Sequence, residues 1–138
     1  MVFIRLQSAV PNRRGVFPGV FAMANGLRDA GLLSPTDEEQ VRRWNAHGER
    51  TYTDPSTVLA DCYDPAVNPG ARSWFRDDAT ELLQMALRYT ELLDRCEVPW
   101  TQLRTARPGR IVYEDPVQVV AVPFTYDEHW PLTPPRTA

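Results

Sequence analysis

The sequence predicts an α+β fold in which three helices pack on one face of a small, mostly antiparallel sheet. Two observations support this fold class. Residues 109–124 consist of two segments rich in β-branched residues, separated by Glu114, Asp115 and Pro116, which is the pattern of an antiparallel hairpin. Residues 73–96 carry a continuous apolar stripe at helical spacing. Because a bare hairpin is marginally stable in water, we expect the rest of the chain to cover it.

The N-terminal third predicts one strand and two helices. Residues 2–10 alternate partly between apolar and polar side chains, as a half-buried strand does, and residues 11–15 then break the pattern with turn residues. A first helix follows, with Gly31 in the position that closes it. A second helix begins with Ser34 as N-cap and Pro35 in its first turn.

The middle of the chain predicts a long connection followed by the main helix. Residues 49–72 show neither a helical nor a strand period and carry several prolines. A connection of this length is unusual inside a domain and is more often a binding loop or a misread element. The leucine-rich helix at 73–96 follows, and Pro99 ends it.

The C-terminal part predicts a three-strand meander. A short strand at 100–106 turns into the hairpin at 109–124, and we expect the N-terminal strand to join the sheet beside one of these later strands. The proline-rich residues 127–138 predict an extended C-terminal tail. We therefore expect a single domain over residues 1–126.

The absence of lysine excludes several chemistries. All fifteen basic residues are arginine, so the chain has no lysine for a Schiff base, a pyridoxal aldimine or a P-loop. Codon bias explains the absence most simply, and the exclusion holds whichever cause applies. The net charge of −3 argues against nucleic acid and anionic membranes as partners, and no apolar run approaches the length of a membrane span.

The cysteines and histidines predict neither a metal centre nor a disulfide framework. Cys62 and Cys96 are isolated and lack CxxC spacing. A metal site would draw on His47, Glu49 and His129, whose spacing matches no metal motif, so we expect no metal and no cofactor. The N-terminal segment is too short and too strand-like for a signal peptide, which favours a cytoplasmic location.

The strongest candidate site is a loop between a strand and a helix. A helix N-terminus offers free N–H groups, and two neighbouring guanidiniums can grip a carboxylate or a phosphate. The residues of this predicted anion site are Asn12, Arg13, Arg14 and Gly15, with Arg72 ahead of the main helix as a further contributor. The alternative is that these arginines belong to a solvated turn.

A second candidate site lies in the long connection, where acids and phenols gather. Carboxylates and tyrosines can carry out acid–base chemistry where burial shifts their pKa values. The proton-transfer candidates are Tyr52, Asp54, Asp61 and Tyr63. Aspartates directly before prolines, such as Asp54, are also what turn chemistry alone would select.

Together these features predict a small binding or interaction protein. Its pocket would be formed by the first strand–helix loop and the 49–72 loop, and its ligand would be a small anionic molecule or a partner protein. An exposed edge strand would also allow a homodimer. The alternative is a small enzyme without a cofactor, carrying out acid–base chemistry on an anionic substrate held by arginines.

Overall fold

The computed structural model describes residues 1–124 of the 138-residue chain. It confirms the α+β class, with three long helices, one short helix and five strands among these residues. The described residues divide into two compact units, which we call the helical unit and the sheet unit and describe separately. The predicted tail at 127–138 lies outside the described residues, and the single domain over 1–126 stays a prediction.

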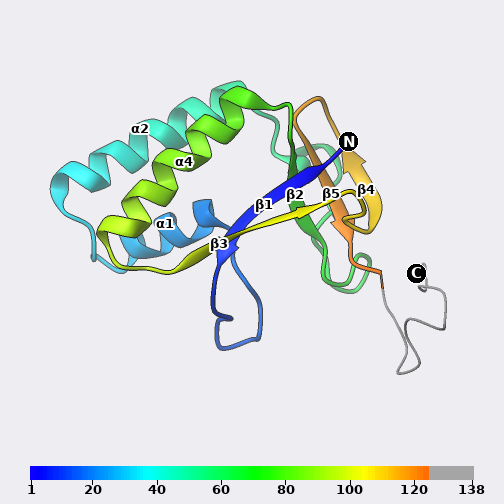
Figure 1. Cartoon of the computed structure of the whole chain (residues 1–138), viewed down its shortest axis with the longest axis horizontal. Helices are drawn as coiled ribbons and strands as arrows, with labels where there is room; N and C mark the ends of the chain where they lie inside the picture. Colours follow the sequence, from blue (N-terminus) through cyan, green and yellow to red (C-terminus); the bar gives the residue numbers. More distant parts are fainter. Residues whose placement is uncertain (125–138) are drawn as a thin grey trace. The chain divides into compact units, whose positions relative to one another are not determined.

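The helical unit comprises Ile4–Thr53 and Thr80–Leu103. Its three helices, α1 (Val20–Asp29), α2 (Pro35–Thr51) and α4 (Thr80–Arg95), pack on one another (Figure 1). It also holds most of strands β1 (Phe3–Ser8) and β3 (Trp100–Thr105), which are neighbours in the strand order. The expectation that the N-terminal strand lies beside a later strand is therefore confirmed.

The helix boundaries follow from local chemistry. Gly31, at φ 71°, takes the left-handed conformation after α1, as predicted. The Ser34 side chain accepts a hydrogen bond from the Asp37 N–H, and Pro35 occupies the first turn of α2. The prediction that the connection starts at residue 49 was wrong, because α2 continues to Thr51. Gly48 lies inside that helix, where a Cβ would come within 3.4 Å of the Met85 side chain of α4.

Tyr89 of α4 lies at the centre of the helical unit, with only 1% of its surface exposed. The Phe21 ring packs edge-on against it at a centroid distance of 4.6 Å, and the Trp44 ring lies 5.2 Å away. The Tyr89 hydroxyl donates a hydrogen bond to Oδ1 of Asn45, whose Nδ2 donates to Oδ1 of Asn25 at 2.7 Å. A series of side-chain hydrogen bonds thus joins all three helices inside an aromatic cluster.

The described part of the sheet unit comprises Met1–Phe3, Asp54–Ala79 and residues 104–124. Its strands are β2 (Arg72–Arg76), β4 (Arg110–Glu114) and β5 (Gln118–Val122), preceded by the short helix α3 (Pro55–Val58). Strand β5 lies between β2 and β4 and pairs antiparallel with both. All five residues of β5 are buried. The predicted hairpin is confirmed as β4 and β5.

Two predictions about this region were wrong. The main helix was expected to begin at residue 73, but residues 72–76 form strand β2 and the helix begins at Thr80. Trp74 pairs with Val119 of β5, so strand pairing prevails over an apolar spacing that only appears continuous with α4. The predicted three-strand meander is also incorrect, because the second partner of β5 is β2, whereas β3 neighbours β1.

Candidate functional site

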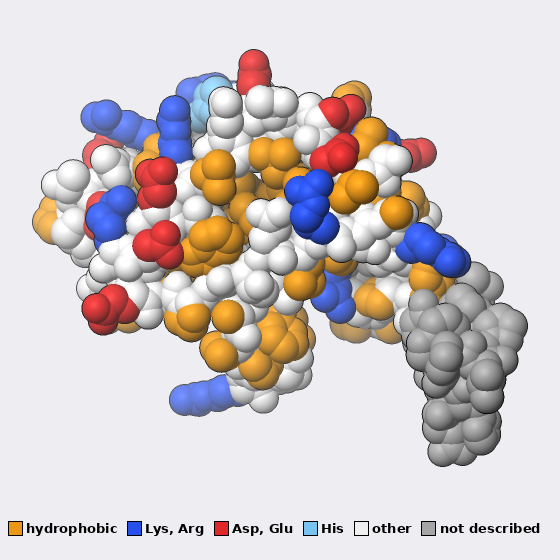
Figure 2. All heavy atoms as spheres, viewed as in Figure 1, with side chains coloured by type: hydrophobic (Ala, Val, Ile, Leu, Met, Phe, Trp, Pro, Cys, Tyr) orange, Lys and Arg blue, Asp and Glu red, His pale blue; other side chains and the backbone are white. Residues whose placement is uncertain are grey.

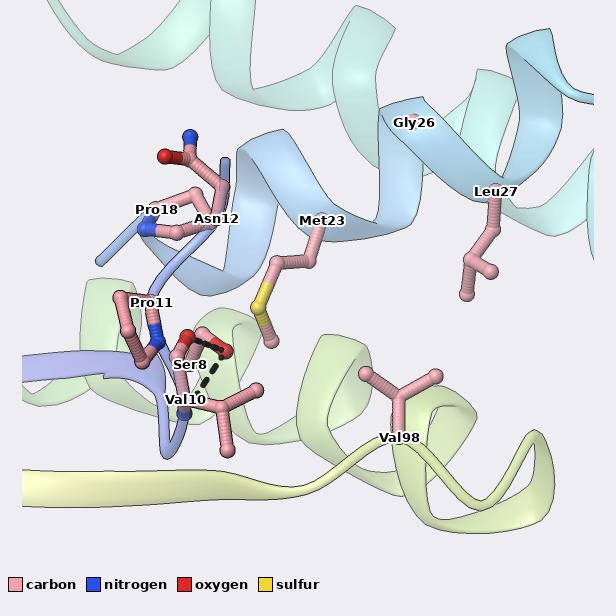
Figure 3. A pocket seen from close by; sticks show the side chains of 9 residues that line it. All are labelled: Ser8, Val10, Pro11, Asn12, Pro18, Met23, Gly26, Leu27 and Val98. Atoms are coloured by element: carbon pink, nitrogen blue, oxygen red, sulfur yellow. Dashed lines mark hydrogen bonds between the residues drawn. The ribbon is translucent and has the colours of Figure 1, made fainter. Parts of the chain in front are cut away.

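The helical unit contains an apolar hollow of about 290 Å³ beside the loop that joins β1 to α1. We call residues 9–18 the β1–α1 loop. Met23 and Leu27 line the hollow from α1, Val98 lines it from the segment after α4, and Val10 lines it from the loop (Figure 3). Leu27 and Val98 face each other at one end, and Met23 points toward Val10 at the other.

The local backbone fixes Val98 at the wall of this hollow. Glu97 has φ 58°, which is the left-handed conformation at the end of α4. The Val98 N–H then donates to the Leu93 carbonyl at 2.9 Å, which turns the chain back toward β3. No sequence pattern predicts this arrangement, because the walls come from separate segments and meet only in the folded unit.

The polar side chains that line the hollow form hydrogen bonds with backbone groups of the loop. The Ser8 hydroxyl donates to the Val10 carbonyl at 2.7 Å, and its oxygen lies 3.2 Å from the Val10 N–H (Figure 3). The Asn12 amide points away from Met23 in the same view. Its Oδ1 accepts hydrogen bonds from the N–H groups of Arg14 and Val16, each at 3.0 Å. The interior of the hollow therefore presents mainly carbon atoms.

The predicted anion-binding residues Asn12, Arg13, Arg14 and Gly15 all lie in the β1–α1 loop. The two Asn12 bonds and the left-handed Gly15, at φ 75°, fix the loop backbone. The side chains of Arg13 and Arg14 are exposed, and within residues 1–124 neither has a hydrogen bond or an ion pair. Arg72, the further contributor, lies in β2 of the sheet unit opposite Ala121, and its part in this site stays a prediction.

Hydrophobic side chains gather over the same loop in the space-filling view (Figure 2). Val10 and Val16 are each 55% exposed. The β1–α1 loop thus combines two guanidiniums that have no partner in residues 1–124 with exposed apolar surface and an adjoining apolar hollow. Such a combination can hold a ligand that has both a negative charge and an apolar part.

The second predicted site lies in a segment whose polar groups are largely used in turns. Asp54 accepts hydrogen bonds from the N–H and hydroxyl of Ser56 and is the N-cap of α3. Asp64 accepts from the Ala66 N–H at 2.9 Å. The buried side chain of Asn68 donates to the carbonyls of Asp61 and Cys62, at 3.2 and 3.1 Å. Residues 54–71 therefore form a connection held by its own side chains.

The four proton-transfer candidates are divided between the two units. Tyr52 is the C-cap residue of α2 in the helical unit, and burial together with Glu81 raises its pKa. Asp54, Asp61 and Tyr63 are exposed residues of the sheet unit. Burial, Asp61 and Asp54 also raise the pKa of the neighbouring Cys62 thiol, so this buried group is protonated at neutral pH.

A polar cluster at the hairpin turn was not predicted as a site. Burial raises the pKa of Tyr113 to about 12, and its hydroxyl donates a hydrogen bond to Asp115 at 2.8 Å. Burial alone would raise the pKa of Asp115, but hydrogen bonds from Val117, Tyr113 and Gln118 lower it below its ordinary value. These contacts close the turn between β4 and β5, which accounts for the cluster.

Within residues 1–124, no three His, Cys, Asp or Glu side chains are grouped as metal ligands would be. His129, one of the three residues considered for a metal, lies outside the described residues. None of the helices in this part of the chain has the length and apolar character needed to cross a membrane. Compared with protein-family models, with curated protein sequences and with solved structures, the chain shows no match.

Proposed function

We propose that this protein binds anionic ligands and that Arg13 and Arg14 make the contact. The observation that supports this proposal is that both side chains are exposed and unpaired in the described part of the chain. They are neighbours on an exposed loop, and they have no partner among residues 1–124. A guanidinium matches carboxylate and phosphate groups in a bidentate geometry, so two adjacent ones offer a matched receptor for such an anion.

The fixed backbone of the loop strengthens this proposal. Asn12 and Gly15 hold the turn without using either arginine side chain. A ligand would therefore order two side chains but not the backbone beneath them, which lowers the entropic cost of binding. A cytoplasmic location is part of the proposal, and the two free cysteines, Cys62 and Cys96, agree with a reducing compartment.

The alternative proposal, an acid–base enzyme, has less support from the contacts. Its carboxylates would have to face the arginine-bound anion. Asp54 caps α3, and the carboxylate of Asp64 in the same segment holds a turn. A side chain that performs a structural task of this kind has less freedom to transfer a proton. We therefore favour binding over catalysis.

Thermal unfolding with and without inorganic phosphate, sulfate and citrate at constant ionic strength tests the proposal. An anion present at ten times its Kd should stabilise the protein by about 1.4 kcal/mol, because it binds only the native state. The double variant Arg13→Ala with Arg14→Ala should abolish this effect and leave the stability of the ligand-free protein nearly unchanged.

A second pair of adjacent arginines provides the control. Arg42 and Arg43 lie on α2 in the same unit and are already paired with Glu38 and Glu39. The double variant Arg42→Ala with Arg43→Ala should retain the stabilisation by the anion. The proposal fails if none of the three anions stabilises the wild-type protein, or if both double variants lose the effect equally.

A further inference from the structure

We infer that the apolar hollow receives an aliphatic side chain of an acidic partner protein, whose carboxylates meet Arg13 and Arg14. This inference rests on the proposed function and goes beyond it by naming the class of partner. The partner's carboxylates would contact the β1–α1 loop, and its aliphatic side chain would enter the adjoining hollow. The two contacts would lie next to each other, because Asn12 lines the hollow and directly precedes Arg13.

The size of the hollow favours a side chain over a whole organic ligand. Its volume of about 290 Å³ lies at the lower limit of small-molecule pockets, which enclose most of their ligand. This hollow instead opens to solvent, since Val10 lines it and is still 55% exposed. An open recess of this size suits one or two aliphatic groups projecting from another protein surface.

The lining of the hollow favours an aliphatic group. Met23, Leu27 and Val98 supply carbon and sulfur surface, and the Ser8 hydroxyl is already bonded to Val10. A polar group placed there would lose its water without gaining a partner, which is costly. Met23 is unbranched and adaptable, so it can adjust to the shape of an incoming side chain.

The charge beside the hollow selects an acidic partner. Among residues 1–124, no acidic residue lines the hollow, and the side chains of the two arginines that follow Asn12 have no partner there. A basic partner would be repelled, whereas glutamates or aspartates flanking an aliphatic residue would find both guanidiniums within one loop.

Binding of two synthetic peptides, measured by isothermal titration calorimetry, tests this inference. One peptide has a central leucine flanked by glutamates, and the other has alanine in its place. We expect the leucine peptide to bind about tenfold more tightly, as half-burial of the additional aliphatic carbons would give. In the Val10→Asp variant this tenfold ratio should disappear.

Val16→Asp is the matched control. Val16 belongs to the same loop and has the same exposed fraction as Val10, but it does not line the hollow. Both variants add the same charge, so a difference between them in the ratio of the two peptide Kd values reports on the hollow alone. Val16→Asp should retain the tenfold ratio. The milder pair Val10→Ser and Val16→Ser makes the same comparison without added charge.

The outcomes separate the inference from the proposed function. Equal binding of both peptides, with loss of binding in the Arg13→Ala and Arg14→Ala double variant, overturns the inference and leaves the proposed function intact. An equal loss of the ratio in the Val10 and Val16 variants also overturns the inference. If neither peptide binds and no inorganic anion stabilises the protein, both the inference and the proposed function fail.

Discussion

The β1–α1 loop and residues 54–71 are both irregular and rich in turns, but they use their polar side chains differently. In residues 54–71, Asp54, Asp64 and Asn68 all bond to nearby backbone groups. In the β1–α1 loop, Asn12 holds the turn by two side-chain bonds, whereas the side chains of Arg13 and Arg14 remain unpaired within residues 1–124. Residues 54–71 are therefore stabilised by their polar side chains. The β1–α1 loop, in contrast, carries two charged side chains that take no part in its hydrogen bonds.

This difference shows that residue type alone is a poor guide to a site. Residues 54–71 contain acids, a phenol and a thiol, so by composition they are better suited to catalysis than the β1–α1 loop. Their contacts assign several of them to turns, and Cys62 is buried with a raised pKa. A side chain without a structural task is the better candidate for ligand binding. The predictions below test whether the two segments really differ in this way.

The largest expected effect is at Asn68. Asn68→Ala should destabilise the protein by up to about 3 kcal/mol, because it removes the buried side-chain donor to the Cys62 carbonyl and one of the two donors to the Asp61 carbonyl. Asn12→Ala should cost about 1 kcal/mol or less, because its bonds are exposed and water can replace them. Urea unfolding of both variants measures this, and equal losses would abolish the distinction between the two segments.

A smaller effect is expected at Tyr89, a buried polar group with a structural task in the helical unit. Burial raises the pKa of Tyr89 to about 12, whereas in the unfolded chain it is about 10. The stabilisation from the neutral phenol is therefore complete below pH 10, and it decreases as the pH rises toward 12. The loss should reach about 2–3 kcal/mol once both pKa values are passed.

The Tyr89→Phe variant isolates this contribution from that of the other tyrosines. At pH 7 it should be about 1–2 kcal/mol less stable than the wild-type protein, because Oδ1 of Asn45 loses its donor. Above pH 10 the difference between the two proteins should shrink. Urea unfolding at pH 7, 10 and 11 provides the test, and a difference that stays constant with pH would contradict a buried, neutral Tyr89.

Elements with local signals could be predicted from the sequence. Ser34 and Pro35 mark the start of α2, Gly31 marks the end of α1, and the β-branched residues on both sides of Pro116 mark the hairpin. Each signal acts through hydrogen bonds or backbone angles within a few residues. The α+β class followed from these elements because few arrangements can bury their apolar faces.

Elements that depend on distant partners could not be predicted. Residues 72–76 form a strand that pairs with the distant β5, and their apolar spacing joins that of α4 by coincidence. The structural role of Asn68 requires the turn that brings the Asp61 carbonyl to it. The candidate site shows the same division, because its arginines are visible in the sequence whereas the hollow that Leu27 and Val98 line together is not.

Mapping of ligand contacts by amide chemical shifts is the most direct test of the central claim that the β1–α1 loop is the binding surface. The titrant is the leucine–glutamate peptide, and inorganic phosphate is added in a parallel experiment. We predict that the largest shifts occur at residues 12–15 with both ligands, and that Met23, Leu27 and Val98 also shift with the peptide alone. Shifts concentrated at Tyr52, Asp54, Asp61 and Tyr63, with residues 12–15 unchanged, would contradict it.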